Sequence, residues 1–559
     1  MKKWEIQNTL NTQDSKFKIE DIITILLKNR ELVKKKDIDV FFQPTKPEKI
    51  TSEMIGIDSV SFEKGISRIR KAIKKRESIV VYADYDADGI TAGAIMWETI
   101  HHLGGKIMPY IPHRVEEGYG LSVKGISTVI KQYNPSLIIT VDHGISAKDS
   151  VDYAKSKGID VIVTDHHVKP DKLPDCSCIH TTMLCGAGIS WFVTRKLQEK
   201  YRKKGAEFEE HIALAAIGTI ADMMPLKGVN RTIAKYGLEA IRKTQRIGLS
   251  ALIFDAGLQK DTISTHDISH ILAPRINAMG RLVHAMDALR LLCTRDSNRA
   301  AELARTLSLT NKERQQLTID TTMHADSIVK SRKGLPKLLF VSHESYNQGV
   351  IGLVAGKLVE VYYRPAIVLS RGKIVSKASA RSIAGFNIVE AIRTCSDILV
   401  DVGGHPMAAG FTVETKYLQQ LQDRLEQLAD KELSEEQLTR ILGIDTEIPL
   451  EAITEELWER LRSFEPFGFG NHEPVFATRG VAVDDARLVG GDGKHLKLTF
   501  SQPTTHNLQP IAISAIAFGL GDYYPRLRPY KPVYIAYTID MNVWNGTRSI
   551  QLKIKDIHI

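Results

Sequence analysis

One sequence pattern constrains the fold more than any other. A short, apolar, β-branched run that ends in acidic or histidine residues recurs along the first third of the chain. The three runs are SIVVYADYD (78–86), SLIITVDHG (136–144) and DVIVTDHH (160–167), and helix-like segments separate them. Short buried strands that alternate with helices predict a parallel sheet. The polar ends of the strands then meet at the C-terminal edge of the sheet, where open α/β sheets bind ligands.

The chain has 559 residues, too many for one hydrophobic core, and this length predicts three or four domains. We expect an α/β multidomain protein. Its expected parts are a basic N-terminal segment (1–45), an α/β domain (46–299), a long helical connector (300–334), a second α/β domain (335–439) and a small β-barrel (440–559). Short strands separated by Gly, Asp and Pro indicate the barrel, with an oligonucleotide-binding (OB) fold as the leading candidate.

Composition excludes several classes of protein. The chain is 43% hydrophobic and 25% charged, which argues against a disordered or fibrous protein. No apolar run reaches the roughly 18 residues that span a bilayer, and the N-terminus lacks the apolar core of a secretory signal, so we expect no membrane partner. Five cysteines, an odd number, form no disulfide framework and favour a cytoplasmic protein. The net charge of +9 permits a polyanionic partner.

The polar residues at the strand ends, with one from a helical segment, form a set rich in carboxylates and imidazoles. They are Asp84, Asp86 and Asp88 in DYDADG, Asp142 in VDHG, Asp165, His166 and His167 in TDHH, and Asp222 in GTIADM. Burying so many carboxylates together is costly, and divalent cations are the simplest compensation. Two cations bridged by one carboxylate can use a set of this size. Oxygen and imidazole ligands suit manganese or magnesium, so we predict a dinuclear site for one of these ions.

Each motif has a plainer interpretation when it is taken alone. DxDxDG resembles a calcium loop, although it follows a buried strand and lacks the glutamate at position 12. An isolated aspartate at a strand end most often caps a helix or a turn. A lone pair of histidines is more often structural than metal-binding. The combination of all four motifs in one sheet favours the metal centre.

The ordered motifs resemble a known superfamily. DYDADG, VDHG, TDHH and GTIADM are similar to the four motifs of the DHH phosphoesterases, and KASARSIAGFNI (377–388) and GGHPMAAGF (403–411) are similar to the DHH-associated domain. Four further segments narrow the resemblance to the RecJ-type single-strand-specific exonucleases, over roughly residues 45–559. They are IPHRVEEGYGL (111–121), APRINAMGRL (273–282), YNQGVIGLVAGKL (346–358) and FEPFGFGNHEPVF (464–476).

The resemblance implies a metal-dependent 5′-to-3′ exonuclease that hydrolyses single-stranded DNA to mononucleotides in DNA repair and recombination. It implies that the two cations, manganese or magnesium, are bound by Asp86, Asp88, Asp142, His166 and Asp222. Asp142 would bridge the two ions, and Asp84 would be a further ligand or would support one. His167 would contact the scissile phosphate, and Asp165 would orient the histidine pair. The catalytic set is therefore Asp84, Asp142, His166, His167 and Asp222.

Arginine suits phosphate because its planar fork makes paired hydrogen bonds. The resemblance implies a pocket for the 5′ phosphate made by Ser379 and Arg381. Arg275, Asn277 and Arg281 would line the adjacent path, and His405 would face the active site across the domain interface. Arg114, in a family-like motif, is also expected to bind the nucleic acid. Tyr119, between two glycines, is predicted to stack on a base. The alternatives are that each arginine bridges domains through carboxylates and that Tyr119 is a turn residue.

Two features depart from the family pattern. Tyr82 stands where many relatives have a histidine, so we expect one metal to bind more weakly or through water. The loop at 168–188 is short and carries Cys176, Cys178, His180 and Cys185. This run could bind a soft metal. The favoured interpretation is that the cysteines are small apolar fillers.

Two other functions remain as alternatives. One is a DHH phosphodiesterase for short oligonucleotides or cyclic dinucleotides, against which the 440–559 region argues. The other is a catalytically inactive DNA-binding scaffold, against which the filled carboxylate positions argue. The expected partners are single-stranded DNA and, as candidates, a helicase and a single-strand-binding protein. We expect a monomer.

Overall fold

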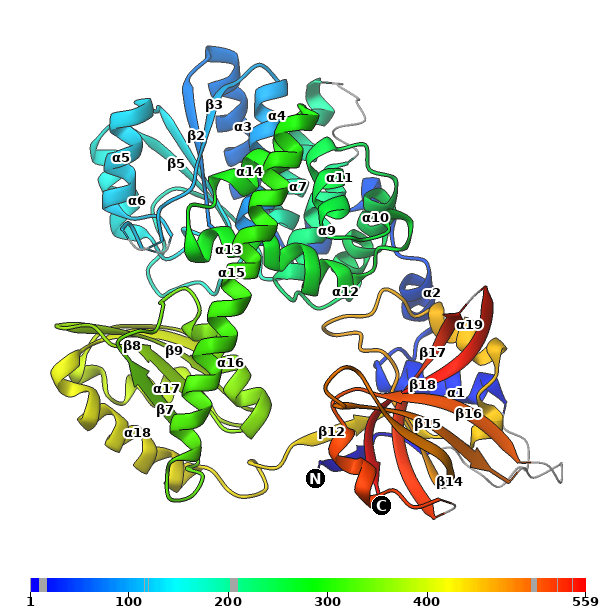
Figure 1. Ribbon diagram of the computed structural model, residues 1–559. Coiled ribbons are helices and arrows are strands. Elements are labelled where there is room, and N and C mark those ends of the chain that lie inside the picture. The colour runs from blue at the N-terminus through cyan, green and yellow to red at the C-terminus, as the bar shows by residue number, and fades with distance from the viewer. Residues whose placement is uncertain are drawn as a thin grey trace. The chain divides into compact units, whose positions relative to one another are not determined.

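The computed structural model divides into two compact units (Figure 1). The described residues are 2–9, 18–114, 116–118, 120–201, 210–503, 510–529, 531–544 and 546–559. The first unit, here called the barrel unit, comprises Met1–Ile50, Met223–Lys235 and Ile441–Ile559. The second, the two-sheet unit, comprises Thr51–Asp222 and Tyr236–Arg440. No helix among the described residues is long and apolar enough to cross a membrane.

The first sheet of the two-sheet unit is the predicted parallel sheet. Its order is β3-β2-β4-β5-β6, and all of its pairings are parallel. The strands are β2 (Ser78–Ala83), β3 (Lys106–Tyr110), β4 (Leu137–Val141), β5 (Asp160–Asp165) and β6 (Ser177–His180). The chain order reverses at β2, which has β3 on one side and β4 on the other. Such a reversal opens a crevice at the C-terminal ends of the neighbouring strands.

Helices cover both faces of this sheet (Figure 1). One face carries α5 (Val123–Tyr133) and α6 (Lys148–Ser156), whose apolar residues pack with Val80, Ile138 and Val163. The other layer contains α3, α4, α7 and α9, and α4 packs on both α7 and α9. The bounds are α3 (Ser59–Lys75), α4 (Ala87–His102), α7 (Gly186–Tyr201), α9 (His211–Ala221), α11 (Ile247–Asp255), α13 (Ala273–Leu282) and α14 (Met286–Cys293). Because α9 is apolar on every side, it is buried throughout.

The long connector is a single helix, α15 (Ser297–Lys330). It starts three residues before the predicted connector (300–334) and is separate from α14, because Asp296 caps its start by accepting a hydrogen bond from Arg299 N at 2.8 Å. Its first half buries Leu303 and Leu307 among the helices, and its last turns pack on the second sheet. With a rise of about 1.5 Å per residue, α15 is about 50 Å long.

The second sheet of this unit has the order β10-β11-β9-β8-β7. Only the β7–β8 pair is parallel, so the predicted second α/β domain is built on a mixed sheet. The elements are β7 (Leu339–His343), α16 (Ile351–Tyr362), β8 (Ala366–Ser370), β9 (Val375–Arg381), α17 (Ile388–Arg393), β10 (Leu399–His405), β11 (Ala408–Glu414) and α18 (Leu418–Glu432). Ser379 and Arg381 are at the C-terminal end of β9.

The barrel unit contains the predicted OB-type barrel. Its sheet has the order β13-β14-β15-β16-β18-β17, and an additional β14–β17 pairing closes it. The strands are β13 (Thr446–Glu447), β14 (Phe476–Val489), β15 (His495–Gln502), β16 (Ile511–Ala517), β17 (Pro532–Trp544) and β18 (Thr547–His558). Phe476, Phe500 and Tyr537 fill the interior. Closure leaves no free edge between β14 and β17.

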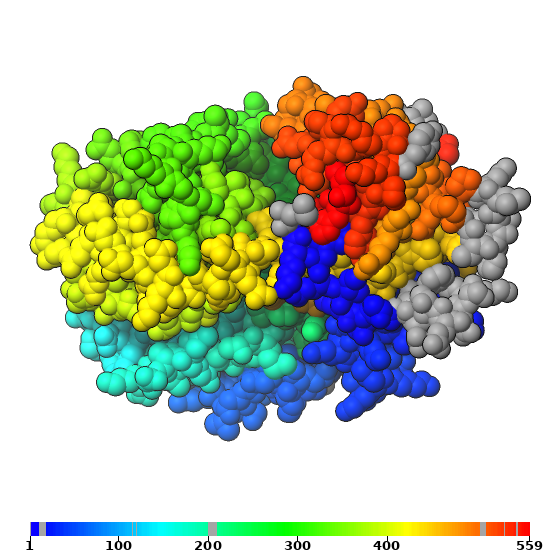
Figure 2. All heavy atoms as spheres, turned by 90° about the horizontal axis from the view of Figure 1, so that it is seen from below, coloured from blue at the N-terminus to red at the C-terminus, as the bar shows by residue number. Residues whose placement is uncertain are grey.

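The N-terminal segment, expected to be a basic extension, is built into the barrel unit. β1 (Lys3–Ile6) pairs in parallel with β12 (Ile441–Ile444), and Trp4 stacks on His558 with 4.0 Å between the ring centres. Figure 2 accordingly has the N-terminal residues, in blue, against the C-terminal residues, in red. α1 (Ile19–Asn29) adds an apolar face, Ile22, Ile23, Leu26 and Leu27, to the barrel core. The basic count of this segment gave no sign of that buried face.

Residues Met223–Lys235, expected in the first α/β domain, also belong to the barrel unit. Arg231 links this segment to other parts of the barrel unit. It is 1% exposed, its guanidinium lies 3.8 Å from the centre of the Phe41 ring, and it donates to the carbonyl oxygens of Phe41 and Glu465 at 2.7 and 2.8 Å. Asn471 of the FGFGN motif donates to the carbonyls of Phe464 and Pro466, each at 2.9 Å. These contacts give the motif a structural role.

Candidate metal centre and phosphate pocket

The structure brings together the carboxylates and histidines that the sequence singled out. Three groups have potential ligand atoms within 4.8 Å of one another. They are Asp84, Asp86 and Asp142; Asp88, His166 and Asp222; and Asp142, His166 and His167. Asp142 and His166 each belong to two groups, an arrangement that suits shared ligands of two ions. We call these seven residues the carboxylate cluster, and their individual metal-binding roles stay predictions.

The backbone at Asp142 is forced into its position. Its φ is 69°, in the left-handed region that costs a residue other than glycine about 1 kcal/mol or more. Asp142 N is held by Thr164 O at 3.0 Å. A Cβ at Gly186 would lie 2.5 Å from Asp142 Cβ, and a Cβ at Gly218 would lie 2.4 Å from Asp88 Oδ1. Glycine is therefore required where α7 and α9 approach the carboxylates.

Two helix N-termini point at the cluster. Asp86 Oδ1 caps α4 by accepting from the backbone N–H groups of Asp88 and Gly89, each at 3.0 Å. Asp88 accepts from Gly186 N at 2.7 Å and Ala187 N at 2.9 Å, at the start of α7. The positive ends of both helices partly offset the negative charge.

The electrostatics of the cluster fit bound cations. Asp84 is 3% exposed and Asp142 2%, and burial followed by the charges of neighbouring carboxylates raises the pKa of each. The pKa of Asp222 is raised for the same two reasons. Within the described part of the chain, Asp84 Oδ1 is buried without a hydrogen-bond partner. The donor set of carboxylates and imidazole is the one that manganese and magnesium accept, so the residues present fit a pair of these ions.

The pKa values of the two histidines of TDHH are shifted in opposite directions. His166 Nε2 lies 3.1 Å from Asp142 Oδ1 and 3.7 Å from Asp222 Oδ2, and burial lowers the pKa of His166, which favours the neutral ligand form. Burial also opposes the charge of His167, but Asp165, whose Oδ1 lies 2.8 Å from His167 Nδ1, outweighs it and raises the pKa of His167. A cationic imidazole suits a phosphate contact.

Asp165 is held as an orienting group, as the sequence predicted. Its carboxylate accepts from Ile145 N at 2.8 Å, His166 N at 2.7 Å and His167 N at 3.1 Å. From the other sheet, exposed His405 lies opposite His167, with 6.5 Å between ring centres and 13° between ring planes. His405 therefore faces the cluster, as predicted.

Beside the cluster, four arginines gather. Burial and then the charges of Arg114, Arg381 and Arg314 lower the pKa of Arg281 to about 10, and Asp86 is the carboxylate that opposes them. The guanidinium of Arg114 lies 5.0 Å from the centre of the Tyr85 ring. None of these four arginines, here called the arginine cluster, forms an ion pair within the described ranges. Three were predicted from motifs, whereas Arg314, on α15, was missed.

The N-terminus of α16 lies against this cluster. A Cβ at Gly352 would lie 2.8 Å from Ser379 Oγ and 3.2 Å from Arg381 Nη2. Arg381 Nη1 donates to Ser379 Oγ at 3.3 Å, and Arg281 Nη1 donates to Gly349 O at 3.3 Å. A helix N-terminus beside guanidinium groups forms an anion site. This arrangement fits the predicted phosphate pocket.

Three other predicted residues have different surroundings. Asn277 Oδ1 accepts from Ala87 N at 2.6 Å, so its carbonyl supports the start of α4. Arg275 donates to Ser308 Oγ at 3.1 Å and Ile271 O at 2.8 Å, which are structural contacts between helices. DNA binding by Asn277 and Arg275 stays a prediction. Tyr119 lies outside the described residues.

Tyr82 does not occupy a ligand position. Its buried ring packs with Tyr110, at 5.0 Å between ring centres, in the apolar layer beneath α5 and α6. Cys176 and Cys178 pack against the same layer, with their sulfur atoms 3.7 Å apart. His180 Nε2 lies 2.7 Å from His167 O, so this nitrogen already has a hydrogen-bond partner. These contacts favour the filler interpretation of the cysteines over a soft-metal site.

Comparisons with known proteins agree with this architecture. Family models match residues 78–219 (DHH family, N-terminal domain), 335–431 (DHHA1 domain) and 444–556 (RecJ OB domain). The single-stranded-DNA-specific exonuclease RecJ of Bacillus subtilis is 37% identical over 501 residues, which cover 88% of this chain and 62% of that protein. This chain thus spans less than two thirds of the Bacillus relative.

Other relatives match over most of their length. RecJ of Salmonella typhimurium is 31% identical over 541 residues, 90% of each chain. The crystal structure of Thermus thermophilus RecJ in complex with Mn2+ has a TM-score of 0.84 and 26% identity, and the match covers 100% of this chain and 79% of that one. The chain belongs to the RecJ family of single-stranded-DNA-specific exonucleases.

Proposed function

We propose that this protein is a metal-dependent exonuclease that hydrolyses single-stranded DNA from its 5′ end, releases mononucleotides and acts in DNA repair and recombination in the cytoplasm. The observation that carries the proposal is the presence, in one unit, of the buried carboxylate cluster beside the arginine cluster. One site fits divalent cations, and the other fits phosphate. The names of the relatives, which describe single-stranded-DNA-specific exonucleases, support the same substrate.

The first and second groups of the carboxylate cluster would each hold one ion, and Asp142 of the first group, whose Oδ1 lies 3.1 Å from His166 Nε2 of the second, would be shared. Bound manganese or magnesium would supply a water of lowered pKa as nucleophile and would neutralise charge on the phosphate. His167, whose charged form Asp165 favours, would donate a hydrogen bond to an oxygen of the scissile phosphate. His405 would approach the same phosphate from the other sheet.

The arginine cluster and the start of α16 would define the polarity. A terminal 5′ phosphate carries up to two negative charges, whereas an internal phosphodiester carries one. A pocket with four arginines and a helix N-terminus therefore favours the terminal group. When the pocket holds that group, the bond next to the 5′ end is presented to the carboxylate cluster.

The barrel would bind the strand that follows. Arg487 and Lys497 are direct partners on β14 and β15, and burial together with the charge of Arg487 lowers the pKa of Lys497. Phe518, at the end of β16, is 61% exposed and lies edge-on to His495, with 5.4 Å between ring centres. Cations with an exposed aromatic ring are typical of surfaces that bind single strands.

We infer that the protein acts as a monomer on strands that a helicase has unwound and that a single-strand-binding protein covers. Both classes of partner generate or hold single strands, which the barrel surface fits. Pull-down of the purified chain with each class would test this part separately.

Digestion of matched oligonucleotides tests the main proposal. A single strand labelled at its 5′ end should release labelled mononucleotide at once in manganese, whereas the 3′ label should appear as a mononucleotide only late. The same sequence in a blunt duplex should stay intact, and a dinucleotide should not compete. Absence of release, or equal digestion of the duplex, would refute the proposal, and preference for the dinucleotide would favour a short-oligonucleotide phosphodiesterase.

A further inference from the structure

Arg314 lies in the middle of α15, the connector helix, and belongs to no motif that the sequence pointed out. Its Nη2 donates to Asn311 Oδ1, one turn earlier, at 2.7 Å. Its Nε is buried and has no hydrogen-bond partner among the described residues. A buried guanidinium donor without a partner is costly, so Arg314 has an unmet demand for an acceptor.

Other arginines of the same unit have their charge compensated by a carboxylate, even where, as in Arg246, the Nε is also buried without a hydrogen-bond partner among the described residues. Arg246 donates to both oxygens of Glu98, at 2.7 and 2.8 Å, and Arg299, on α15 itself, pairs with Glu302 at 3.0 Å. Arg314 has no such carboxylate in the part of the chain that the structure describes. A buried structural arginine has either such a carboxylate or, like Arg231, several carbonyl acceptors, and among the described residues Arg314 has neither.

The position of Arg314 indicates which acceptor is missing. α15 packs on α13, which carries Arg281, and on α16, whose first turn lies beside Arg381. The charge of Arg314 acts on Arg281, as do the charges of Arg114 and Arg381, and burial lowers the pKa of Arg314. Four cationic groups, opposed by Asp86 beside Arg281 and by Asp84 beside Arg114, form a site for an anion of more than one charge. The N-terminus of α16, beside Arg381, adds backbone donors to the same site.

We propose that Arg314 is a phosphate-binding residue, and that the connector helix thereby supplies the fourth guanidinium of the pocket that holds the terminal 5′ phosphate. This assignment rests on the proposed function, because it takes the 5′ end of a single strand as the ligand. It extends the pocket beyond Ser379 and Arg381 to a helix that also packs on the second sheet. A 5′ phosphate bound in this pocket would therefore contact α15 directly.

Binding without cleavage tests the role of Arg314. Fluorescence anisotropy in EDTA would compare 5′-phosphorylated and 5′-hydroxyl oligodeoxynucleotides on wild type, Arg314→Gln, Arg314→Lys and the control Arg305→Gln. Arg305 is an exposed residue of the same helix, so its substitution removes the same charge elsewhere. Melting temperatures would establish that all variants are folded.

Arg314→Gln should weaken binding of the phosphorylated strand about tenfold and reduce the preference over the hydroxyl strand, because a charge-assisted contact is lost. The slope of log affinity against log salt should fall by about 0.7, the value for one phosphate contact on a single strand. Arg314→Lys should retain part of the affinity, and Arg305→Gln should match wild type. Equal weakening by Arg314→Gln and Arg305→Gln, or no weakening by either, would overturn the assignment. Failure of wild type to bind any single strand would instead refute the proposed function.

Discussion

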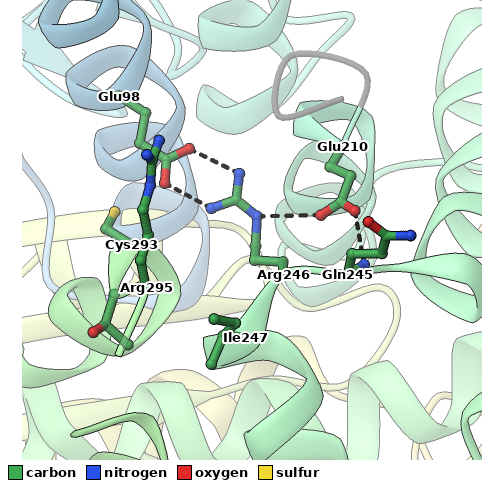
Figure 3. A pocket seen from close by; sticks show the side chains of 8 residues that line it. Glu98, Glu210, Gln245, Arg246, Ile247, Cys293 and Arg295 are labelled. Carbon is green, nitrogen blue, oxygen red and sulfur yellow. Dashed lines mark hydrogen bonds and ion pairs between the residues drawn. The ribbon is translucent and has the colours of Figure 1, made fainter. Parts of the chain in front are cut away.

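The two-sheet unit contains two buried groups of ionisable side chains that are built in opposite ways. In the carboxylate cluster, acidic groups face one another. In the other group, Glu98 accepts two hydrogen bonds from Arg246 (Figure 3). Glu98 also lies 3.0 Å from His211 Nε2. We call this second group the Glu98 network. It borders a cavity of about 340 Å3, and Arg246 also lies 3.9 Å from Glu210.

Burial acts on both groups, and the partners decide the outcome. Burial alone would raise the pKa of Glu98, but the hydrogen bonds from His211 and Arg246 lower it to about 2. In the cluster, burial and like charges act together, and the pKa of Asp84 and of Asp142 rises. The charges of the Glu98 network are paired within the chain, so the network contributes to stability. The carboxylates of the cluster repel one another, so bound cations would lower the electrostatic energy of the folded chain.

The arginines differ in the same way. The two hydrogen bonds to Glu98 outweigh burial and raise the pKa of Arg246, whereas burial and neighbouring arginines lower that of Arg281. A site that must bind a phosphate has to leave its cations unpaired until the ligand arrives. Carboxylates and arginines that are not paired with each other, close together in one unit, are therefore the distinguishing electrostatic feature of this site.

The sharpest way to separate the two groups is Asp142→Asn. Cleavage of a single strand should fall by about 1,000-fold or more, equivalent to about 4 kcal/mol, because the proposed shared ligand is lost. Asparagine tolerates the left-handed backbone at this position, so the fold should persist. In EDTA the variant should melt above wild type, since a like charge is removed. Steady-state rates and calorimetry measure both effects, and a lower melting temperature in EDTA would contradict the contrast.

Glu98→Gln should have the reverse effect. Removing the carboxylate leaves Arg246 and His211 buried without their counter-charge, at a cost of about 3 kcal/mol in the free energy of unfolding. Urea denaturation measures this loss. Manganese affinity should stay unchanged, because Glu98 belongs to none of the three ligand groups. The double variant Glu98→Gln with Arg246→Met should regain part of the lost stability. Full additivity of the two single effects would mean that Glu98 and Arg246 are not coupled.

Metal binding should stabilise the protein through the cluster alone. At a manganese concentration 100 times the dissociation constant, wild type should gain about 2.7 kcal/mol of unfolding free energy. Asp142→Asn should gain much less, whereas Glu98→Gln should gain as much as wild type from its lower starting point. Thermal melts in EDTA and in manganese measure the gain. An equal gain in all three proteins would place the metal elsewhere.

The carboxylate cluster was predictable because its residues follow strands, and a parallel sheet brings strand ends to one edge. No such sequence pattern identifies Arg314, because α15 is polar on most of its surface. The packing of the helix decides which of its residues faces the pocket. The Glu98 network joins residues from different helices without a shared motif. The pairing of β1 with β12 links residues more than 400 positions apart, and local sequence patterns contain no information about such partners.

Acid provides a final and smaller test of the comparison. The pKa of Glu98 is about 2 in the folded protein, below the unfolded value of about 4.5. Its stabilising effect is therefore complete above pH 4.5 and is lost progressively as pH falls toward 2, with about 1 kcal/mol lost by pH 4. The stability difference between wild type and Glu98→Gln should narrow by that amount between pH 7 and pH 4 in urea titrations. A constant difference over this range would mean that Glu98→Gln is less stable for a reason other than its lost charge. Packing rather than ion pairing would then stabilise the network.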